Sequence, residues 1–224
     1  TNYRPISLIP ALGKLLDHFV NLQLTNFVFM NKLICRQQFG FVRNRSTTDQ
    51  LLMLLEKAYK AMDKKSCYDI VFLDFSKAFD RVSHRVLVHI MQNLCTPETT
   101  EWFSSYLFNR SIEVKIGLAT SNQRKLHSGV PQGSHLGPML FVLYVNSLAR
   151  AVRYCDLFLF ADDTAVGKER VPTCTPTELR KDLMSCSTWA NSVCGQFNPN
   201  LHICQSMRRQ HQRHLFRRRY KFQQ

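Results

Sequence analysis

Hydrophobic and polar positions in the first third of the chain predict two helices and one short strand. We expect a helix over 12–29, where apolar residues are frequent but follow no clean period. Apolar residues recur at helical spacing over 51–62, and Thr47 and Gln50 ahead of them have the spacing of a capping box, so a second helix is predicted there. The run 70–75 is apolar and rich in strand-forming residues, which predicts a strand that ends at an aspartate.

The rest of the chain contains several further helical patterns. They cover 83–94, 102–107, 139–152 and 176–193. The segment 139–152 is apolar nearly all round, which is typical of a helix buried on every side. Thr175 and Glu178 occupy the cap and box-acid positions at the start of the last helix.

Strand patterns are short in this part of the chain. Apolar and charged residues alternate over 112–116, which predicts a strand followed by a glycine turn. The segments 157–160 and 164–166 predict two very short strands on either side of a turn. Asp162 and Asp163 are therefore expected at the tip of a hairpin.

The net charge of the chain indicates the class of partner that it binds. The chain has 224 residues, is 45% hydrophobic and has a net charge of +14 with a pI near 9.7. It can therefore bury a substantial core, and it favours a polyanionic partner, nucleic acid first and an acidic membrane second. The last twenty residues contain seven Lys or Arg and no acid, so half of the net charge lies in this tail.

The expected cellular compartment is inferred from the absence of membrane-span, signal-peptide and C-x-x-C patterns in the sequence. Its longest apolar run, 139–145, is far shorter than the roughly 20 residues of a membrane span, and no cleavable signal opens it. Eight cysteines are present without a C-x-x-C pair, which favours reduced thiols, and the spacing of Cys194, His202 and Cys204 matches no zinc pattern. We expect an intracellular protein, in the nucleus or the cytoplasm, without a membrane partner.

Three acids stand out as candidates for chemistry. Asp74 ends an apolar strand, and Asp162 with Asp163 fills the turn between two others. Carboxylates beside buried strands cost free energy unless a partner neutralises them, and a divalent cation is one such partner. The alternative is ordinary turn chemistry, because aspartate favours turn positions in any protein.

Five segments favour the metal-site interpretation through a family resemblance. IVFLDFSKAFDRV (70–82), SGVPQGSHLGPMLF (128–141) and FADDT (160–164) resemble, in order and spacing, the A, B and C motifs of a reverse transcriptase. NYRPISL (2–8) and QQFGFVRNRSTTDQ (37–50) resemble the finger motifs that precede them in non-LTR (LINE-type) retrotransposon enzymes.

The resemblance implies an α+β fold with the fingers and palm of a right-hand polymerase, in which an antiparallel palm sheet packs on helices. The corresponding regions are a fingers-like part over 1–69, a palm over 70–204 and a disordered basic tail over 205–224. No thumb is expected in twenty residues without an apolar stripe, and the Thr at position 1 suggests a fragment, so we expect a truncated copy with impaired activity.

The resemblance also implies a function and its cofactors. It implies an RNA-directed DNA polymerase that transfers nucleotides from dNTPs to the 3′-hydroxyl of a DNA primer on an RNA template. Asp74, Asp162 and Asp163 are the catalytic carboxylates and the ligands of two Mg²⁺ ions, which Mn²⁺ can replace. Asp74 and Asp162 are the principal ligands, and no obligate protein partner is inferred.

Several residues match the positions at which this family contacts the nucleotide. Phe79 is expected under the incoming sugar, where it would exclude a 2′-hydroxyl, although a packed core aromatic is the alternative. Phe75 is assigned to the same nucleotide site. Gln132 is expected along the incoming nucleotide, and Gly133 would allow close backbone approach, although a simple Gly-Pro turn would also account for this loop.

Basic residues complete the expected site. Arg43 and Arg45 lie in the loop of the motif 37–50, called the finger loop below, where they would meet triphosphate or template phosphates. Arg4 and Lys77 are candidate nucleic-acid contacts. Each is equally compatible with a solvated surface position. The aromatic residues at helical positions are expected in the core rather than on a base-stacking surface; they are Trp102, Tyr106 and Trp189.

The resemblance weakens towards the end of the chain, which keeps two rival interpretations open. The family's lysine near the active site is replaced by Leu201 or His202, and no likeness extends past Cys204. One rival is a catalytically inactive, basic nucleic-acid-binding remnant of a retroelement. The other is a related polymerase such as a group II intron maturase, against which the segment RSTTDQ favours the retrotransposon branch.

Overall fold

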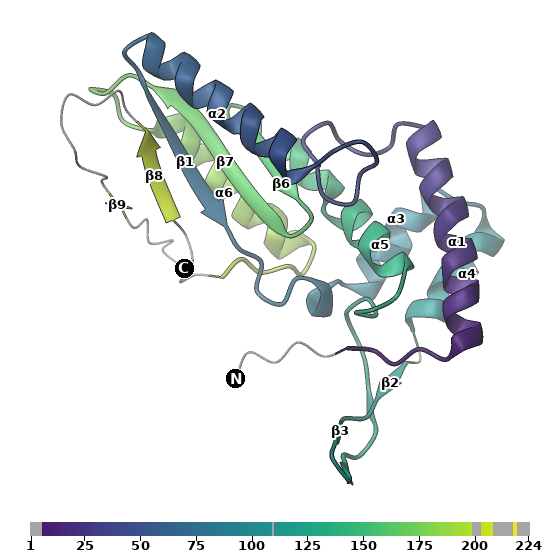
Figure 1. Ribbon diagram of the computed structural model, residues 1–224. Coiled ribbons are helices and arrows are strands. Elements are labelled where there is room, and N and C mark those ends of the chain that lie inside the picture. Colours follow the sequence, from purple (N-terminus) through teal and green to yellow (C-terminus); the bar gives the residue numbers. More distant parts are fainter. Residues whose placement is uncertain (1–5, 109, 199–202, 208–216, 219–224) are drawn as a thin grey trace.

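A computed structural model of the chain describes residues 6–108, 110–198, 203–207 and 217–218 (Figure 1). The helices, including two 3₁₀ helices, are α1 (Ala11–Met30), α2 (Thr47–Asp63), η1 (Phe79–Arg81), α3 (His84–Gln92), α4 (Pro97–Leu107), α5 (Leu136–Val145), η2 (Asn146–Arg150) and α6 (Thr177–Ser192). The strands are β1 (Cys67–Leu73), β2 (Ser111–Ile112), β3 (Lys115–Ile116), β4 (Ala119–Thr120), β5 (Arg124–Lys125), β6 (Asp156–Phe160), β7 (Asp163–Arg170), β8 (Ile203–Met207) and β9 (Arg217–Arg218).

An antiparallel sheet with the strand order β6-β7-β1-β8-β9 forms one half of the molecule (Figure 1). β1 lies at its centre and pairs with β7 from Cys67 opposite Arg170 to Leu73 opposite Thr164. Six of the seven residues of β1 are buried, as expected for a strand covered on both faces. The predicted antiparallel sheet packed on helices is confirmed.

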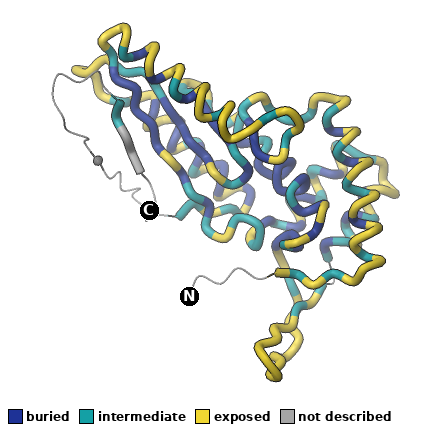
Figure 2. Tube along the Cα trace, viewed as in Figure 1, coloured by how far each residue is buried: buried dark blue, intermediate teal, exposed yellow. Residues whose placement is uncertain are grey.

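Helices cover both faces of this sheet (Figures 1 and 2). On one face, Leu54, Ala58 and Ala61 of α2 pack against Tyr68 and Ile70 of β1 and their neighbours on β6 and β7. The larger core on the other face joins β1 and β6 to α5 and α6. Alternation along β1 therefore divides its side chains between two separate cores.

Helix α5 is the centre of the second half of the molecule, where it contacts α1 and α3. All its residues except Pro138 are buried, which confirms the prediction of a helix buried on every side. Its N-terminus is held by Asp17 of α1, which is 2% exposed and whose Oδ2 accepts hydrogen bonds from the backbone N–H of His135 (2.5 Å) and Leu136 (3.4 Å). Tyr106 of α4 donates to Oδ1 (3.0 Å), so one buried carboxylate links three helices.

Two predicted helix caps differ from the structure. The helix predicted behind Thr47 begins at that residue, and its capping box consists of Ser46 and Asp49, one residue earlier than predicted from Thr47 and Gln50. At α6 the predicted Thr175 cap is wrong, because Pro176 occupies the N-cap position and no side chain caps the helix.

The single strand predicted over 112–116 is also wrong. Its residues divide between β2, which pairs with β5, and β3, which pairs with β4, in a thin projection below the body in Figure 1. Gly117 makes the predicted turn with φ of +61°. Ile116 of β3 is 77% exposed and Val114 before it is 51% exposed, so the apolar residues in this part of the projection do not contribute to a core.

The sheet extends beyond 204, the predicted end of the palm. β8 runs to Met207 beside β1, and β9 pairs with β8 through Arg217 opposite Gln205. Residues 205–207 and 217–218, which the sequence analysis assigns to the basic tail, are strand residues of this sheet. Across the described residues, no helix combines the length and apolarity needed to cross a membrane.

A second buried carboxylate, Asp182, joins α6 to the chain that enters β6. It is 1% exposed and accepts hydrogen bonds from the backbone N–H groups of Arg153 (3.1 Å), Tyr154 (2.7 Å) and Cys155 (2.8 Å). Because β6 begins one residue later, this contact fixes the entry of the strand that leads to the Asp162 turn.

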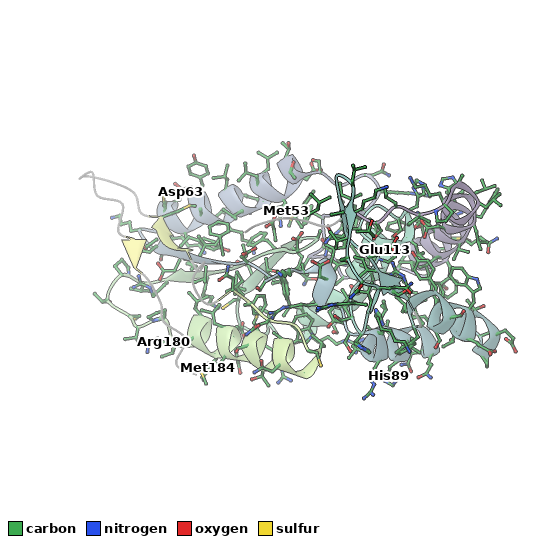
Figure 3. All side chains as sticks on the ribbon, turned by 90° about the horizontal axis from the view of Figure 1, so that it is seen from below. Met53, Asp63, His89, Glu113, Arg180 and Met184 are labelled. Carbon is green, nitrogen blue, oxygen red and sulfur yellow. The ribbon has the colours of Figure 1, made fainter. Side chains whose placement is uncertain are left out.

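We predict that Asp182→Ala lowers the free energy of unfolding by about 3 kcal/mol, because it leaves three backbone N–H groups without their acceptor. Urea denaturation measures this loss. The matched control is Asp63→Ala at the exposed C-terminal end of α2 (Figure 3), which should change stability by less than about 0.5 kcal/mol. Equal effects of the two substitutions would contradict the structural role of Asp182.

Candidate active site

The candidate site lies where β1 and the β6–β7 hairpin end together. Leu73, the last residue of β1, pairs with Thr164 of β7. Asp74 follows Leu73, and Asp163 precedes Thr164, so the antiparallel register brings these two residues to the same end of the sheet, each one position beyond the last β1–β7 pair. The joint site of Asp74 with Asp162 and Asp163, expected from the sequence, stays a prediction.

The hairpin between β6 and β7 is a tight two-residue turn. Phe160 pairs with Asp163, which leaves Ala161 and Asp162 as the turn residues. Ala161 has φ of +54°, a left-handed conformation that a residue with a Cβ adopts only when its surroundings impose it. Asp162 is half-buried and Asp163 is exposed, so the pair lies at the surface end of the hairpin.

A segment of the finger loop, 37–40, runs directly against this hairpin. Leu159 of β6 donates its N–H to the Gln37 carbonyl (2.9 Å), and its own carbonyl accepts from Phe39 (2.7 Å). Gly40 lies so close that a Cβ on it would be 2.3 Å from the Ala161 nitrogen. Only glycine fits at this position, which explains its place in the motif 37–50.

Asp74 itself is held by the chain that follows α6. Its carbonyl accepts a hydrogen bond from the Asn198 backbone N–H (2.7 Å), and its Oδ2 lies 3.5 Å from the Asn198 Nδ2. The next residues are fixed in the same way, since Ser76 donates its backbone N–H to the Gln196 carbonyl (2.9 Å). No sequence pattern indicates this contact, which joins residues 124 positions apart.

The carboxylate oxygens of Asp74, Asp162 and Asp163 are of a type that suits a hard divalent cation. Carboxylate oxygens are the ligands that Mg²⁺ prefers, and Mg²⁺ binds through one or two carboxylates together with phosphates of a substrate. In the part of the chain that the structure describes, no group of three or more His, Cys, Asp or Glu is placed so that it could hold a metal ion. Asp74, Asp162 and Asp163 are among these residues, so a metal site at the three aspartates stays a prediction.

The glycine-rich loop before α5 lies on the loop that follows Asp74. Val130 donates its N–H to the Phe79 carbonyl (2.9 Å), and Gly129 donates to Val82 (2.8 Å). Gly129 has φ of +93°, and a Cβ on it would be 2.9 Å from the Asp80 carbonyl oxygen. The A-like and B-like motifs are therefore in contact through their backbones, as one surface.

Gln132 and Gly133 lie at the exposed edge of that contact. Gln132 donates from Nε2 to the Asp80 Oδ1 (2.7 Å), and its carbonyl accepts from the Ser7 backbone N–H (2.8 Å). Asp80 therefore orients the Gln132 amide. Gly133 has φ of +101°, which requires glycine.

The two phenylalanines assigned to the nucleotide have different environments. Phe79 is half-buried, and its ring stacks on Phe141 of α5 at 4.6 Å between centroids and 21° between planes. Phe75 is 7% exposed and packs against Phe141, Trp189 and Phe197. The structure therefore puts the Phe75 ring in the core, and a nucleotide contact from this residue would have to come from its backbone.

The basic residues predicted to contact phosphates also differ in their environments. Arg43 is exposed, with its guanidinium 5.8 Å from the Phe29 ring centroid, whereas Arg45 donates to the carbonyls of Arg36 (2.7 Å) and Gln38 (2.5 Å). Arg45 therefore holds the finger loop together. Lys77 is exposed beside the site, with φ of +53°.

Three residues named in the sequence analysis lie outside the part of the chain that the structure describes. Arg4, Leu201 and His202 lie outside the described residues. The aromatic residues expected in the core do pack there: Trp189 is 9% exposed, and Trp102 stacks on Tyr106 at 5.4 Å. The seven cysteines whose side chains are described are free thiols, as predicted.

A buried histidine, which the sequence did not single out, supports the glycine-rich loop. His84, at the first turn of α3, has its Nε2 2.8 Å from the Gly129 carbonyl oxygen. A carbonyl only accepts, so Nε2 carries the proton. Burial lowers the pKa of His84 below its ordinary value, although the bond to Gly129 opposes this shift.

We predict that the burial of His84 makes stability pH-dependent. Because the pKa of His84 is lower in the folded chain, the unfolded chain binds more protons near pH 6, and the free energy of unfolding falls as the pH drops from 7 to 5. His84→Gln should reduce this fall, whereas His89→Gln, an exposed residue of the same helix (Figure 3), should not. Denaturation at several pH values measures the slopes, and identical slopes for the three proteins would refute the role of His84.

Comparisons with known proteins give the site its context. The profile of the family "Reverse transcriptase (RNA-dependent DNA polymerase)" matches residues 1–211. The chain is 31% identical over 199 residues to the RNA-directed DNA polymerase from mobile element jockey of Drosophila melanogaster, covering 85% of this chain and 22% of that protein. It is 34% identical over 170 residues to the probable RNA-directed DNA polymerase from transposon X-element of the same species, covering 74% of this chain and 19% of the relative.

Solved structures agree on the fold. A telomerase of Candida tropicalis in complex with a fragment of telomeric RNA superimposes with a TM-score of 0.61 at 13% identity, over 88% of this chain and 34% of that one. A telomerase of Candida albicans gives 0.60, also at 13% identity. The chain spans about a fifth of the length of the polymerases from jockey and X-element.

Proposed function

The chain belongs to the reverse transcriptase (RNA-dependent DNA polymerase) family, and on that premise we propose that it carries the nucleotidyl-transfer site of a non-LTR retrotransposon polymerase. In this proposal a DNA primer paired with an RNA template is extended by dNTPs. The observation that carries the proposal is the register of β1 and β7, which brings Asp74 to the Asp162–Asp163 turn.

The aspartates supply the negative charge of the proposed site. Asp74 and Asp162 are the principal ligands of a divalent cation pair, and Asp163 is the more replaceable carboxylate. A bound pair of Mg²⁺ ions, or Mn²⁺ in their place, would supply the charge that activates the primer 3′-hydroxyl and stabilises the departing pyrophosphate. The protein's own contribution is to hold the carboxylates on two adjacent strand ends that the sheet fixes rigidly.

The loop surface between the A-like and B-like motifs would receive the nucleotide. Gln132 lies along the base and sugar, with its amide oriented by Asp80. Gly133 allows backbone approach because it has no Cβ. Phe79 lies under the sugar, and its stacking on Phe141 prevents it from moving aside for a 2′-hydroxyl.

Charge supports a nucleic-acid partner for this surface. The net charge of +14 includes the exposed side chains of Arg43 and Lys77 near the finger loop and the candidate site. Basic side chains bind the phosphate backbone with an affinity that falls steeply with salt. The same charge is compatible with a second function, a nucleic-acid-binding remnant without catalysis, which the polymerase experiment below distinguishes.

We predict that the chain extends a DNA primer on an RNA template in Mg²⁺, and that the Asp162→Asn, Asp163→Asn double variant lowers the rate at least about 100-fold. The loss follows from removing the carboxylate charge at the hairpin. Primer extension on gels measures it, with Asp63→Asn on α2 as the matched control that keeps the parent rate.

Two results would contradict the proposal. If the folded parent incorporates no dNTP in Mg²⁺ or Mn²⁺ but binds RNA in a salt-sensitive manner, the binding-remnant function replaces it. If the double variant retains the parent rate, the incorporation does not depend on these aspartates.

We predict that Phe79→Val raises the ratio of kcat/KM for rNTPs to that for dNTPs by about 10-fold or more, because the smaller side chain leaves room for a 2′-hydroxyl. Single-nucleotide incorporation with each substrate measures the ratio. Phe19→Val, at an exposed position on α1, is the control. If Phe79 is only a packing residue, both values of kcat/KM fall together and the ratio stays at that of the parent.

A further inference from the structure

Gln38 is a buried polar residue that the proposed mechanism does not use. Its side chain is fully buried (0% exposed) although it belongs to a loop outside the sheet. Its Oε1 accepts two hydrogen bonds of 2.9 Å, one from the Gly40 backbone N–H and one from the Ala161 backbone N–H. The second bond joins the finger loop to the turn that carries Asp162.

The Ala161 contact is important because that turn is strained. Ala161 has φ of +54° and lies outside the β6–β7 ladder, in which Phe160 and Asp163 are the last pair. A buried N–H in such a turn needs an acceptor from elsewhere in the chain. Gln38 supplies that acceptor from a residue 123 positions away in sequence.

The surrounding contacts fix Gln38 in place. Its backbone is bridged to Leu159 of β6, and its carbonyl accepts from the Arg45 guanidinium (2.5 Å). On the next turn of the segment, Gly40 packs directly on the backbone of Phe160 and Ala161. The loop and the hairpin are therefore a single packed unit.

The unused half of the Gln38 amide indicates that packing is not the reason for the residue. Its Nε2 has no hydrogen-bond partner among the described residues, although the atom is buried. A buried donor without a partner costs free energy, so a shorter or apolar side chain would serve packing at least as well. What glutamine provides here is an acceptor oxygen at the right distance from Ala161.

We propose that Gln38 is a positioning residue that holds the Ala161–Asp162 turn in its left-handed conformation and so aims Asp162 and Asp163 at the reacting nucleotide. This inference rests on the proposed function, since it gives the turn a catalytic purpose. Displacing a reacting group by about 1 Å can cost about 100-fold in rate, so a lost anchor is expected to act on kcat.

Gln38→Met tests the proposal because methionine has a similar shape but no strong acceptor. We expect kcat for dNTP incorporation to fall about 10-fold to 100-fold with KM for the dNTP nearly unchanged. We also expect faster hydrogen exchange at the amides of Ala161 and Gly40, which does not depend on activity. Gln92→Met, at an exposed position at the end of α3, is the matched control for both measurements.

Gln38→Glu is the second variant, because it keeps an acceptor oxygen at the same reach. It should retain the slow exchange at Ala161 and Gly40, and it keeps the test decisive if the methionine variant fails to fold. Equal loss of amide protection in the glutamate variant would overturn the proposal. Faster exchange in Gln38→Met with an unchanged kcat would overturn it as well.

These measurements distinguish failure of the proposed polymerase function from failure of the positioning role of Gln38. If the parent chain incorporates no nucleotide, the proposed function fails while the exchange data still decide whether Gln38 holds the turn. If the parent is active and Gln38→Met exchanges and reacts like the parent, the positioning role fails while the polymerase stands.

Discussion

Antiparallel pairing between β1 and β7 is the constraint on which the candidate site depends. The strands are covered by α2 on one face and by α5 and α6 on the other, so their register is fixed by two cores at once. A slip of one residue would exchange the two faces of β1 and move Asp74 away from Asp163. The buried side chains in the middle of β1 and β7 thus fix the register, and the register determines where Asp74 lies at the end of the sheet.

Buried carboxylates elsewhere in the chain show what a purely structural aspartate looks like. Asp17 and Asp182 each accept backbone N–H bonds from the start or entry of another element, and Asp69 is paired with Arg170. These partners neutralise the charge within the protein, so no cation is needed. Asp74 has a longer side-chain contact, 3.5 Å from its Oδ2 to the Asn198 Nδ2, and follows the last residue of β1 that pairs with β7. Neutralisation by an ion and its nucleotide is consistent with this difference.

Much of this arrangement follows from local patterns, and the rest depends on contacts between distant residues. The buried helix α5 and the Asp162 hairpin were predictable because periodicity and turn chemistry are encoded within a few residues. The capping box was misplaced by one residue because Ser46, Thr47 and Thr48 are equally good caps in sequence. Gln38 and His84 left no local signal, since their roles exist only when the finger loop meets β6 and α3 meets the glycine-rich loop.

The most direct test of the central claim, that the ends of β1 and the β6–β7 hairpin share one cation site, is Mn²⁺ binding followed by EPR. Four proteins should be titrated in the presence of a dNTP: the parent, Asp74→Asn, Asp162→Asn and Asp63→Asn. We predict that Asp74→Asn and Asp162→Asn each weaken the same site by about 10-fold or more, while Asp63→Asn matches the parent. Unchanged binding in Asp74→Asn or Asp162→Asn would contradict a shared site.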